Sequence, residues 1–379
     1  MKRIVLVLLG LIVAAELALR IPAVWTAVSS ALPQGPGEVE TLLKRPGGVD
    51  SLQFVRDPEL GNRPRPSIRD TVRTPDFTFV TALDSAGFPN REPWPSPADL
   101  AVLGNSLVVG EGVGIERGFS TLVAHRLGTE RVVNFGLGGA SPEHQLRIYH
   151  RYVAPLHPKV VLAVIWVASD VTNAFNFQRW LASGAGQNFL EYRTSGQAKA
   201  KPGGAAGLAG AIRGSSRLLR VAAGLGVAWK REHGSMPERI PLAAGDTLYL
   251  SRKTEEALAQ GMQRTGLPEL ARVFFGPLDT LRQAVEGDHG QLFVVLIPSK
   301  EELYAAGAYP PVLRAVGEVR RGLDSLHLAT IDLYRPMEAG MTGGAPFFSR
   351  DIHFTVYGNR IVGDALADSL RARGVSFRH

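Results

Sequence analysis

The stretch Asp99–Gly110 reads DLAVLGNSLVVG, and it decides the fold expected for this chain. Its apolar run Leu100–Leu103 has the length and composition of a buried β-strand. Gly104 then permits a sharp turn, and the polar pair Asn105 and Ser106 follows directly at the end of that strand. In a parallel α/β sheet, ligands and reacting groups gather at the carboxyl ends of the strands. The stretch therefore predicts a strand and a functional site beside it.

Four further apolar runs continue the pattern along the chain. Val160–Val167 is unbroken, which is typical of a central parallel strand covered on both faces. The other expected strands are Arg131–Phe135, Leu292–Ile297 and Ala329–Leu333. Amphipathic stretches predict helices over Phe119–Leu127, over Pro142–Val153 with Ser141 as N-cap, and over Thr355–Arg371. Strands that alternate with helices indicate an α/β fold with a five-stranded parallel sheet.

The chain is expected to hold one α/β domain with additions, not several domains in series. Residues 26–97 are rich in Pro, Gly and Arg and predict an extended N-terminal segment that wraps the core. Within it, Phe77–Thr81 alternates apolar and polar residues as a short strand does. The α/β domain is expected over residues 98–379. The alternation of strands and helices stops over about 171–269, where we expect a helical or irregular insertion that acts as a simple cover or as a lid.

The N-terminus has the pattern of a signal-anchor. Two basic residues follow Met1 and precede twelve uncharged residues, Ile4–Ala15, and the apolar stretch extends to Ile21. Glu16 and Arg20 lie near its outer end, where such side chains can reach the interface. We therefore expect residues 1–25 to form a single-pass anchor in the cytoplasmic membrane, with the bulk of the chain in the periplasm. The alternative is a buried N-terminal helix.

The composition removes several classes of protein. The 379 residues include no cysteine, which excludes a thiol nucleophile, a cysteine zinc site and a disulfide framework. No run of residues has the spacing of metal ligands, and we expect neither a metal nor another cofactor. The 42 basic and 35 acidic residues give a net charge of +7, which fits an anionic polymer or membrane surface. The basic residues are scattered, so nucleic acid is not an expected partner.

Because the chain has no thiol, serine is a candidate nucleophile for covalent catalysis, and Ser106 would need a base to take its proton. Of the nine histidines, His353 is the one that lies in a loop with an acidic residue placed to support it as a base. It lies in the polar loop Ser349–His353, and Asp351, two residues earlier, can point the same way in an extended segment. The carboxylate would then bind one ring nitrogen and leave the other to take the Ser106 proton. Two plainer interpretations stay open: Ser106 caps a helix, and Asp351 and His353 are a solvated loop pair.

A glycine-rich stretch, Asn134–Ala140, follows the second expected strand. Its glycines let backbone amides face the site without a side chain in the way. Donors fixed in this manner stabilise the negative charge that develops on a carbonyl oxygen. Nucleotide binding is the alternative, but Gly136-x-Gly138-Gly139 lacks the spacing of a dinucleotide site.

In their order these motifs resemble the GDSL/SGNH hydrolase superfamily of serine esterases and acyl-transfer enzymes. The resemblance implies a flavodoxin-like, three-layer α/β fold. Gly104-Asn105-Ser106 is similar to the block that carries the nucleophile, and Asp351-x-His353 is similar to the block with the acid and the base. The implied catalytic residues are therefore Ser106, His353 and Asp351.

The same resemblance implies an oxyanion hole. Gly139 occupies the donor position of the glycine block, and Ser169 stands where the family usually has asparagine after the third strand. Asn173, one helical turn further on, is a candidate to replace that donor. Asn105, which stands in place of the family's aspartate, and Gly136 are further candidates for substrate or oxyanion support.

Other segments resemble a membrane-anchored, extracytoplasmic branch of the superfamily that includes relatives of alginate O-acetyltransferases. These segments are Asp57–Gly61, Gly87-Phe88 and Ile297–Lys300 followed by Tyr304. The expected function is a serine esterase or deacylase that removes O-acyl groups, chiefly O-acetyl, from an envelope polysaccharide or lipid. One alternative is transfer of the acyl group to a polysaccharide hydroxyl by the same residues. The other is a non-catalytic polysaccharide-binding or assembly protein with a degenerate site.

Overall fold

The computed structural model describes residues 2–31, 54–74, 76–194, 217, 221, 239–241, 247–250, 268–305 and 310–377. The chain divides into two compact units. One combines Met1–Phe54 with Leu190–Pro237, and the other combines Val55–Phe189 with Glu238–His379. Almost all of the Gly/Ala-rich section at 203–229, and much of the expected insertion, lies outside the described residues. The division at residues 25 and 97 and the insertion over about 171–269 stay predictions.

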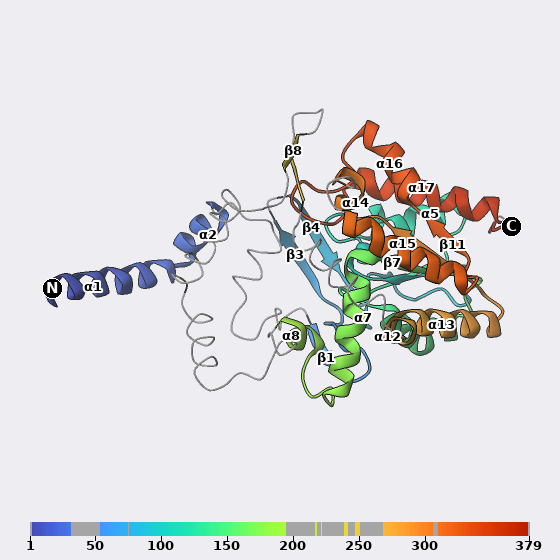
Figure 1. The fold of residues 1–379 in the computed structure, drawn as a ribbon, viewed down its shortest axis with the longest axis horizontal. Coiled ribbons are helices and arrows are strands. Elements are labelled where there is room, and N and C mark those ends of the chain that lie inside the picture. The colour runs from blue at the N-terminus through green and yellow to red at the C-terminus, as the bar shows by residue number, and fades with distance from the viewer. Residues whose placement is uncertain are drawn as a thin grey trace. The chain divides into compact units, whose positions relative to one another are not determined.

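The second unit is built on a five-stranded parallel sheet in the order β11-β10-β7-β5-β6 (Figure 1). Its strands are β5 (Leu100–Gly104), β6 (Val132–Gly136), β7 (Val160–Trp166), β10 (Gln291–Ile297) and β11 (Thr330–Asp332). Every pair of neighbouring strands is parallel. The five expected strands are confirmed, and their order is that of a flavodoxin-like sheet.

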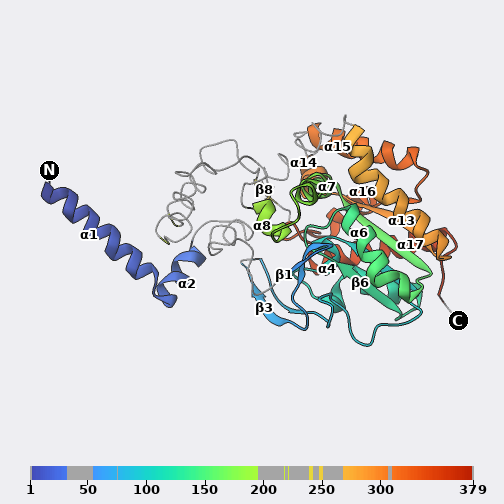
Figure 2. The same cartoon turned by 90° about the horizontal axis from the view of Figure 1, so that it is seen from below.

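Helices cover both faces of this sheet. α5 (Phe119–Leu127) connects β5 to β6, whereas α6 (Pro142–Ile148) begins the connection that returns past β5 to β7. Because such crossovers are right-handed, connections that run in opposite directions across a sheet cover opposite faces. α17 (Val356–Ala372) packs beside α5, and α13 (Gly276–Gly287) packs beside α6 and β10 (Figure 2). The expected three-layer α/β architecture is confirmed.

The burial of the central strands explains why they are apolar throughout. All residues of β5 and of β7 are buried, because helices lie above and below them. The chain leaves β5 toward β6 on one side and then returns to β7 on the other. In open α/β sheets, ligands bind outside the carboxyl ends of the strands, at the point where the connections reverse direction in this way.

The expected helices are present with small differences at their ends. α5 has the predicted bounds, and α17 begins after its N-cap Thr355. Ser141 is the N-cap of α6, as expected, but the α-helix ends at Ile148 and Tyr149–Val153 continues it as a π-helical turn. α7 (Val167–Ala182) follows β7 directly, and α15 (Pro310–Ser325) lies between β10 and β11 in the chain.

In the described part of the chain before the α/β sheet there are four short strands. β1 (Phe54–Asp57) pairs with β2 (Gly61–Pro64). β3 (Arg69–Arg73) pairs with β4 (Thr78–Ala82) in an antiparallel hairpin, so the short strand expected at Phe77–Thr81 is present, one residue later. The turn of this second hairpin carries Asp76, which reaches the candidate site described below.

The expected membrane anchor is wrong. α1 (Lys2–Leu19) has 18 residues, and α2 begins separately at Pro22. Proline disfavours the helical conformation of the residue before it, so the apolar stretch does not continue as one helix through Ile21. α1 also includes the charged residues Lys2, Arg3 and Glu16. Within the described parts of the chain, no helix has both the length and the apolar character needed to cross a membrane. The signal-anchor, the membrane as a partner and the periplasmic location that depended on it are not retained.

Candidate active site

Ser106 lies at the carboxyl end of β5, in the first turn of the short helix α4 (Ser106–Val109). The N-cap of this helix is Asn105, whose Oδ1 accepts a hydrogen bond from the Leu107 amide at 3.0 Å. Ser106 is therefore not the cap that the plainer interpretation proposed. A side chain at Gly104 would place a Cβ atom 3.0 Å from Cβ of Val164, so glycine permits the close approach that brings Ser106 to the edge of the sheet.

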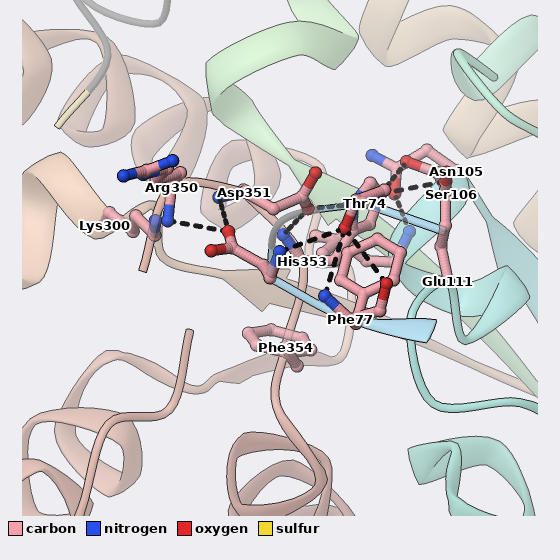
Figure 3. A network of polar contacts seen from close by, with 12 residues as sticks. Thr74, Phe77, Asn105, Ser106, Glu111, Lys300, Arg350, Asp351, His353 and Phe354 are labelled. Atoms are coloured by element: carbon pink, nitrogen blue, oxygen red, sulfur yellow. Dashed lines mark hydrogen bonds and ion pairs between the residues drawn. The ribbon is translucent and has the colours of Figure 1, made fainter. Parts of the chain in front are cut away.

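His353 joins Ser106 to Asp351 through its two ring nitrogens (Figure 3). Its Nε2 lies 2.8 Å from Oγ of Ser106, and its Nδ1 lies 2.5 Å from Oδ1 of Asp351. The His353 amide also donates to the same carboxylate oxygen at 2.8 Å, which fixes the two residues of the loop against each other. His353 is 7% exposed, so the pair is not solvated as the plainer interpretation required. The arrangement connects a serine hydroxyl, an imidazole and a carboxylate in sequence.

Glu111 is a second carboxylate on the same imidazole, and the sequence did not reveal it. Its Oε2 lies 3.2 Å from Nε2 of His353, the nitrogen that also faces Ser106. Glu111 follows α4 and stands between Gly110 and Gly112. A lone carboxylate between two glycines, five residues after the candidate nucleophile, was the signal available.

For both His353 and Asp351, burial and the neighbouring charges shift the pKa in opposite directions. Burial alone would lower the pKa of His353, but the carboxylates of Glu111 and Asp351 outweigh it and raise that pKa to about 9. Burial alone would raise the pKa of Asp351. The charge and hydrogen bonds of His353, with the charge of Lys300, instead hold it below its ordinary value. Both shifts favour an imidazolium between carboxylates when no substrate is present.

Contacts from two distant elements hold the loop that carries Asp351 and His353. One oxygen of Asp76, in the β3–β4 turn, accepts hydrogen bonds from the amides of Arg350 at 2.8 Å and Asp351 at 2.7 Å. Lys300, at the start of α14 (Lys300–Ala305), donates to the Ser349 carbonyl at 3.1 Å. Burial lowers the pKa of Lys300 to about 8, against the opposing charges of Glu301, Asp351 and Asp76. Neither Asp76 nor Lys300 was predicted as part of the site.

Replacement of Asp76 by alanine is expected to lower kcat of the proposed reaction by about 10–100-fold, because small displacements of reacting groups are costly. Two loop amides would lose their shared acceptor, and Asp351 and His353 would no longer be held in position. Asp76→Asn keeps an acceptor oxygen and should retain most of the activity. Asp70→Ala is the control, since Asp70 is exposed in the same hairpin and its carboxylate accepts a hydrogen bond from the neighbouring Thr71 amide. Equal kcat values for Asp76→Ala and Asp70→Ala would contradict the expectation.

The glycine block after β6 lies beside Ser106 at the same edge of the sheet. Gly136 pairs with Gly104 in the sheet register, and the Leu137 amide donates to the Gly104 carbonyl at 2.9 Å. A Cβ atom on Gly136 would meet the Val109 amide nitrogen at 2.5 Å, so this glycine allows α4 to pack on the end of β6. Gly139 has a left-handed φ of 76° and is partly exposed. Its assignment as an oxyanion donor stays a prediction, as does substrate or oxyanion support by Gly136.

The residues after β7 are organised around Asp170, which sequence reasoning did not assign. Asp170 is fully buried in the first turn of α7, and its carboxylate accepts from Nδ2 of Asn105, the Trp166 amide and Oγ of Ser169, each at 2.9 Å. The side-chain amide of Asn105 thus connects the end of β5 to the start of α7. The Ser169 hydroxyl is directed to Asp170, and Asn173 lies buried in the next turn of α7. Roles of Ser169 and Asn173 toward an oxyanion stay predictions.

Comparison with known proteins gives similarities in structure only. No protein-family model matches the sequence, and no curated protein matches it. An acetyl-xylooligosaccharide esterase from Geobacillus has 11% identity and a TM-score of 0.38, over 76% of this chain and 98% of that chain. A lipolytic protein of the G-D-S-L family from Desulfitobacterium hafniense has 10% identity and a TM-score of 0.35, over 72% of this chain and 98% of that chain. A lipase/acylhydrolase from Enterococcus faecalis has 11% identity and a TM-score of 0.36, over 73% and 96%. The assignment of an activity therefore depends on the geometry of the site.

Proposed function

We propose that this chain is a serine hydrolase that cleaves carboxylic esters. The observation that supports it is the continuous hydrogen-bonded series from Oγ of Ser106 through the His353 ring to Asp351, at the carboxyl edge of a parallel sheet. Nucleophilic catalysis by serine needs a base within hydrogen-bond distance and a third group that orients the base. His353, 247 residues after the nucleophile, is within that distance of Ser106, and Asp351, two residues before His353, is within that distance of its other nitrogen.

The proposed reaction has two halves. Oγ of Ser106 attacks the ester carbonyl while Nε2 of His353 takes its proton, and the negative charge moves to the carbonyl oxygen. The imidazolium then donates that proton to the departing alcohol, which leaves an acyl group on Ser106. Water attacks this acyl group, His353 takes the water proton and returns one to Ser106, and the carboxylic acid is released. Asp351 keeps the ring oriented and its charge balanced throughout.

We propose the amides of Ser106 and Gly139 as the donors to the carbonyl oxygen. Both follow adjacent strands, β5 and β6, at the edge where the reacting carbonyl would lie. Such donors contribute about 10²–10³-fold in rate. Ser169, after β7 on the other side, would have to turn its hydroxyl away from Asp170 before it could donate to the oxyanion.

The substrate that we propose is an O-acyl ester, such as an acetyl ester, of a polysaccharide or lipid. Transfer of the acyl group to a sugar hydroxyl would use the same residues, because an alcohol then takes the place of water in the second half. Membership of the branch with the alginate O-acetyltransferase relatives is a further prediction from the sequence motifs. A purely binding role gains no support from the connected Ser106, His353 and Asp351 side chains.

Labelling with a fluorophosphonate tests the proposed nucleophile directly. The reagent should modify the wild-type protein once, and mass spectrometry of its peptides should place the adduct on Ser106. Ser106→Ala and His353→Ala should lose the label, because the first lacks the nucleophile and the second lacks the base. Ser325→Ala is the matched control, since Ser325 is an exposed serine whose hydroxyl donates to a backbone carbonyl. Failure of the folded wild-type protein to react, or an adduct on another serine, would overturn the proposal.

A further inference from the structure

Two acceptor groups compete for one nitrogen of His353. Nε2 lies 2.8 Å from Oγ of Ser106 and 3.2 Å from Oε2 of Glu111, while Asp351 occupies the other nitrogen. Figure 3 shows Asp351 on one side of the ring and Ser106 with Glu111 on the other. The side chain of Glu111 is 40% exposed, whereas that of His353 is 9% exposed. One of the carboxylates in contact with the buried His353 ring is therefore itself partly exposed to solvent.

The backbone of Glu111 is held against the catalytic loop. Gly110 and Gly112 both have left-handed φ values, 77° and 88°, which other residues adopt only with strain. A Cβ atom on Gly112 would meet Cε2 of Phe348 at 2.5 Å, so the turn packs directly on the residue before the loop of Asp351 and His353. The packing of the turn at Gly112 against Phe348 therefore holds Glu111 beside the His353 ring.

The charges around His353 come from several elements. Glu111 follows α4, Asp351 lies in the same loop as His353, and Lys300 reaches this loop from α14. Asp76, from the β3–β4 turn, acts on the loop through the amides of Arg350 and Asp351. Only Glu111 and Asp351 are carboxylates in direct contact with the ring among the described residues.

The protonation state of the His353 ring decides whether its contacts with Ser106 and Glu111 are favourable. A protonated ring donates from both nitrogens, so Nδ1–H binds Asp351 and Nε2–H lies between Ser106 and Glu111. A neutral ring with its proton on Nδ1 would instead present the lone pair of Nε2 to the Glu111 carboxylate, which is repulsive. Proton transfer from Ser106 requires this second state. Glu111 therefore opposes the form of His353 that the reaction needs.

We propose that Glu111 is a positioning residue that holds His353 as an imidazolium and so sets the pH window in which Ser106 can be activated. The inference rests on the proposed function of the Ser106–His353 pair. Because the pKa of His353 is about 9, only about 1% of the rings would be neutral at pH 7. Activity should accordingly rise with pH through that value, since the base form increases as the proton is lost.

The dependence of kcat/KM on pH separates this role from simple structural support. With p-nitrophenyl acetate, a neutral ester, wild-type kcat/KM should rise with an inflection near pH 9, after subtraction of the rate with Ser106→Ala. Glu111→Gln should move the inflection to lower pH by about one unit or more and raise kcat/KM at pH 7 about tenfold. Glu111→Asp keeps the charge on a shorter side chain and should give an intermediate inflection. Glu116→Gln, which removes an equal charge paired with Arg91, should leave the profile in place.

Titration of His353 by ¹⁵N nuclear magnetic resonance tests the inference without any turnover. The ring should lose its proton near pH 9 in the wild-type protein and at lower pH in Glu111→Gln, with the Glu116→Gln ring unchanged. If no ester is cleaved but the titration shifts as expected, the proposed function and the pH window for Ser106 fail, and only the control of His353 protonation by Glu111 stands. If esters are cleaved and Glu111→Gln leaves both the titration and the profile unchanged, the role of Glu111 is overturned and the proposed function stands.

Discussion

Replacement of Ser106 by alanine is expected to lower kcat for ester hydrolysis by about 10⁴–10⁶-fold. The change removes the only hydroxyl that lies within hydrogen-bond distance of Nε2 of His353 in the described structure, at 2.8 Å. Asp351→Asn should lower kcat by about 10⁴-fold, because the ring would no longer be held in the form that accepts the Ser106 proton. Single-turnover and steady-state rates with p-nitrophenyl acetate measure both effects.

The double variant Ser106→Ala/Asp351→Asn gives the sharper result. Groups that act in one step are strongly non-additive, so the double variant should be no slower than Ser106→Ala alone. Asp368→Ala serves as the control because its carboxylate is 77% exposed and pairs with Arg371 on the surface. Independent, multiplying losses from the two substitutions would contradict a shared step for Ser106 and Asp351.

Replacement of Asp170 by alanine should destabilise the protein by about 3–5 kcal/mol, since each buried donor left without its acceptor costs about 1–3 kcal/mol. Three donors would lose their partner: Nδ2 of Asn105, the Trp166 amide and the Ser169 hydroxyl. The side chain of Asp170 is fully buried, so water cannot replace the carboxylate without a local rearrangement. Urea denaturation followed by circular dichroism measures the change in the free energy of unfolding.

Two comparisons make the stability result specific. Asp170→Asn keeps one acceptor oxygen and should lose less stability than Asp170→Ala. Asp368→Ala, which breaks only an exposed ion pair, should change the free energy of unfolding by less than about 1 kcal/mol. A loss in Asp170→Ala no larger than that of Asp368→Ala would show that the network around Asp170 does not support the end of β7.

The sheet could be predicted because its determinants are local. Each of the five strands is a short apolar run, and β5 and β7 are buried along their whole length, which leaves few polar residues to obscure the pattern. Ser106, Asp351 and His353 could also be predicted, because the two loop residues are only two positions apart and the end of β5 is a recognisable position. Their roles are supported by the distances and stay to be tested by experiment.

The rest of the site depends on contacts that no local pattern encodes. Glu111 lies beside His353 in a turn whose Gly112 packs against Phe348, and Asp76 reaches the same loop from a hairpin 275 residues away. Asp170 was visible in the sequence, but its three donors come together only after β5 and β7 pair. The membrane anchor was predicted from two basic residues followed by an apolar stretch up to Ile21, a pattern that did not include the break in the helix before Pro22.

The wide separation of the paired groups has a consequence for the chain while it is being made. A ribosome adds about 5–20 residues per second, so His353 emerges about 10–50 s after Ser106, from which it is 247 residues distant. During that interval the nascent chain presents a serine without its proton acceptor. A product that ends before residue 351 lacks both side chains that would activate Ser106. If the proposed function holds, translation products that end before residue 351 would be unreactive toward esters, and reactivity would require a chain synthesised past His353 and folded.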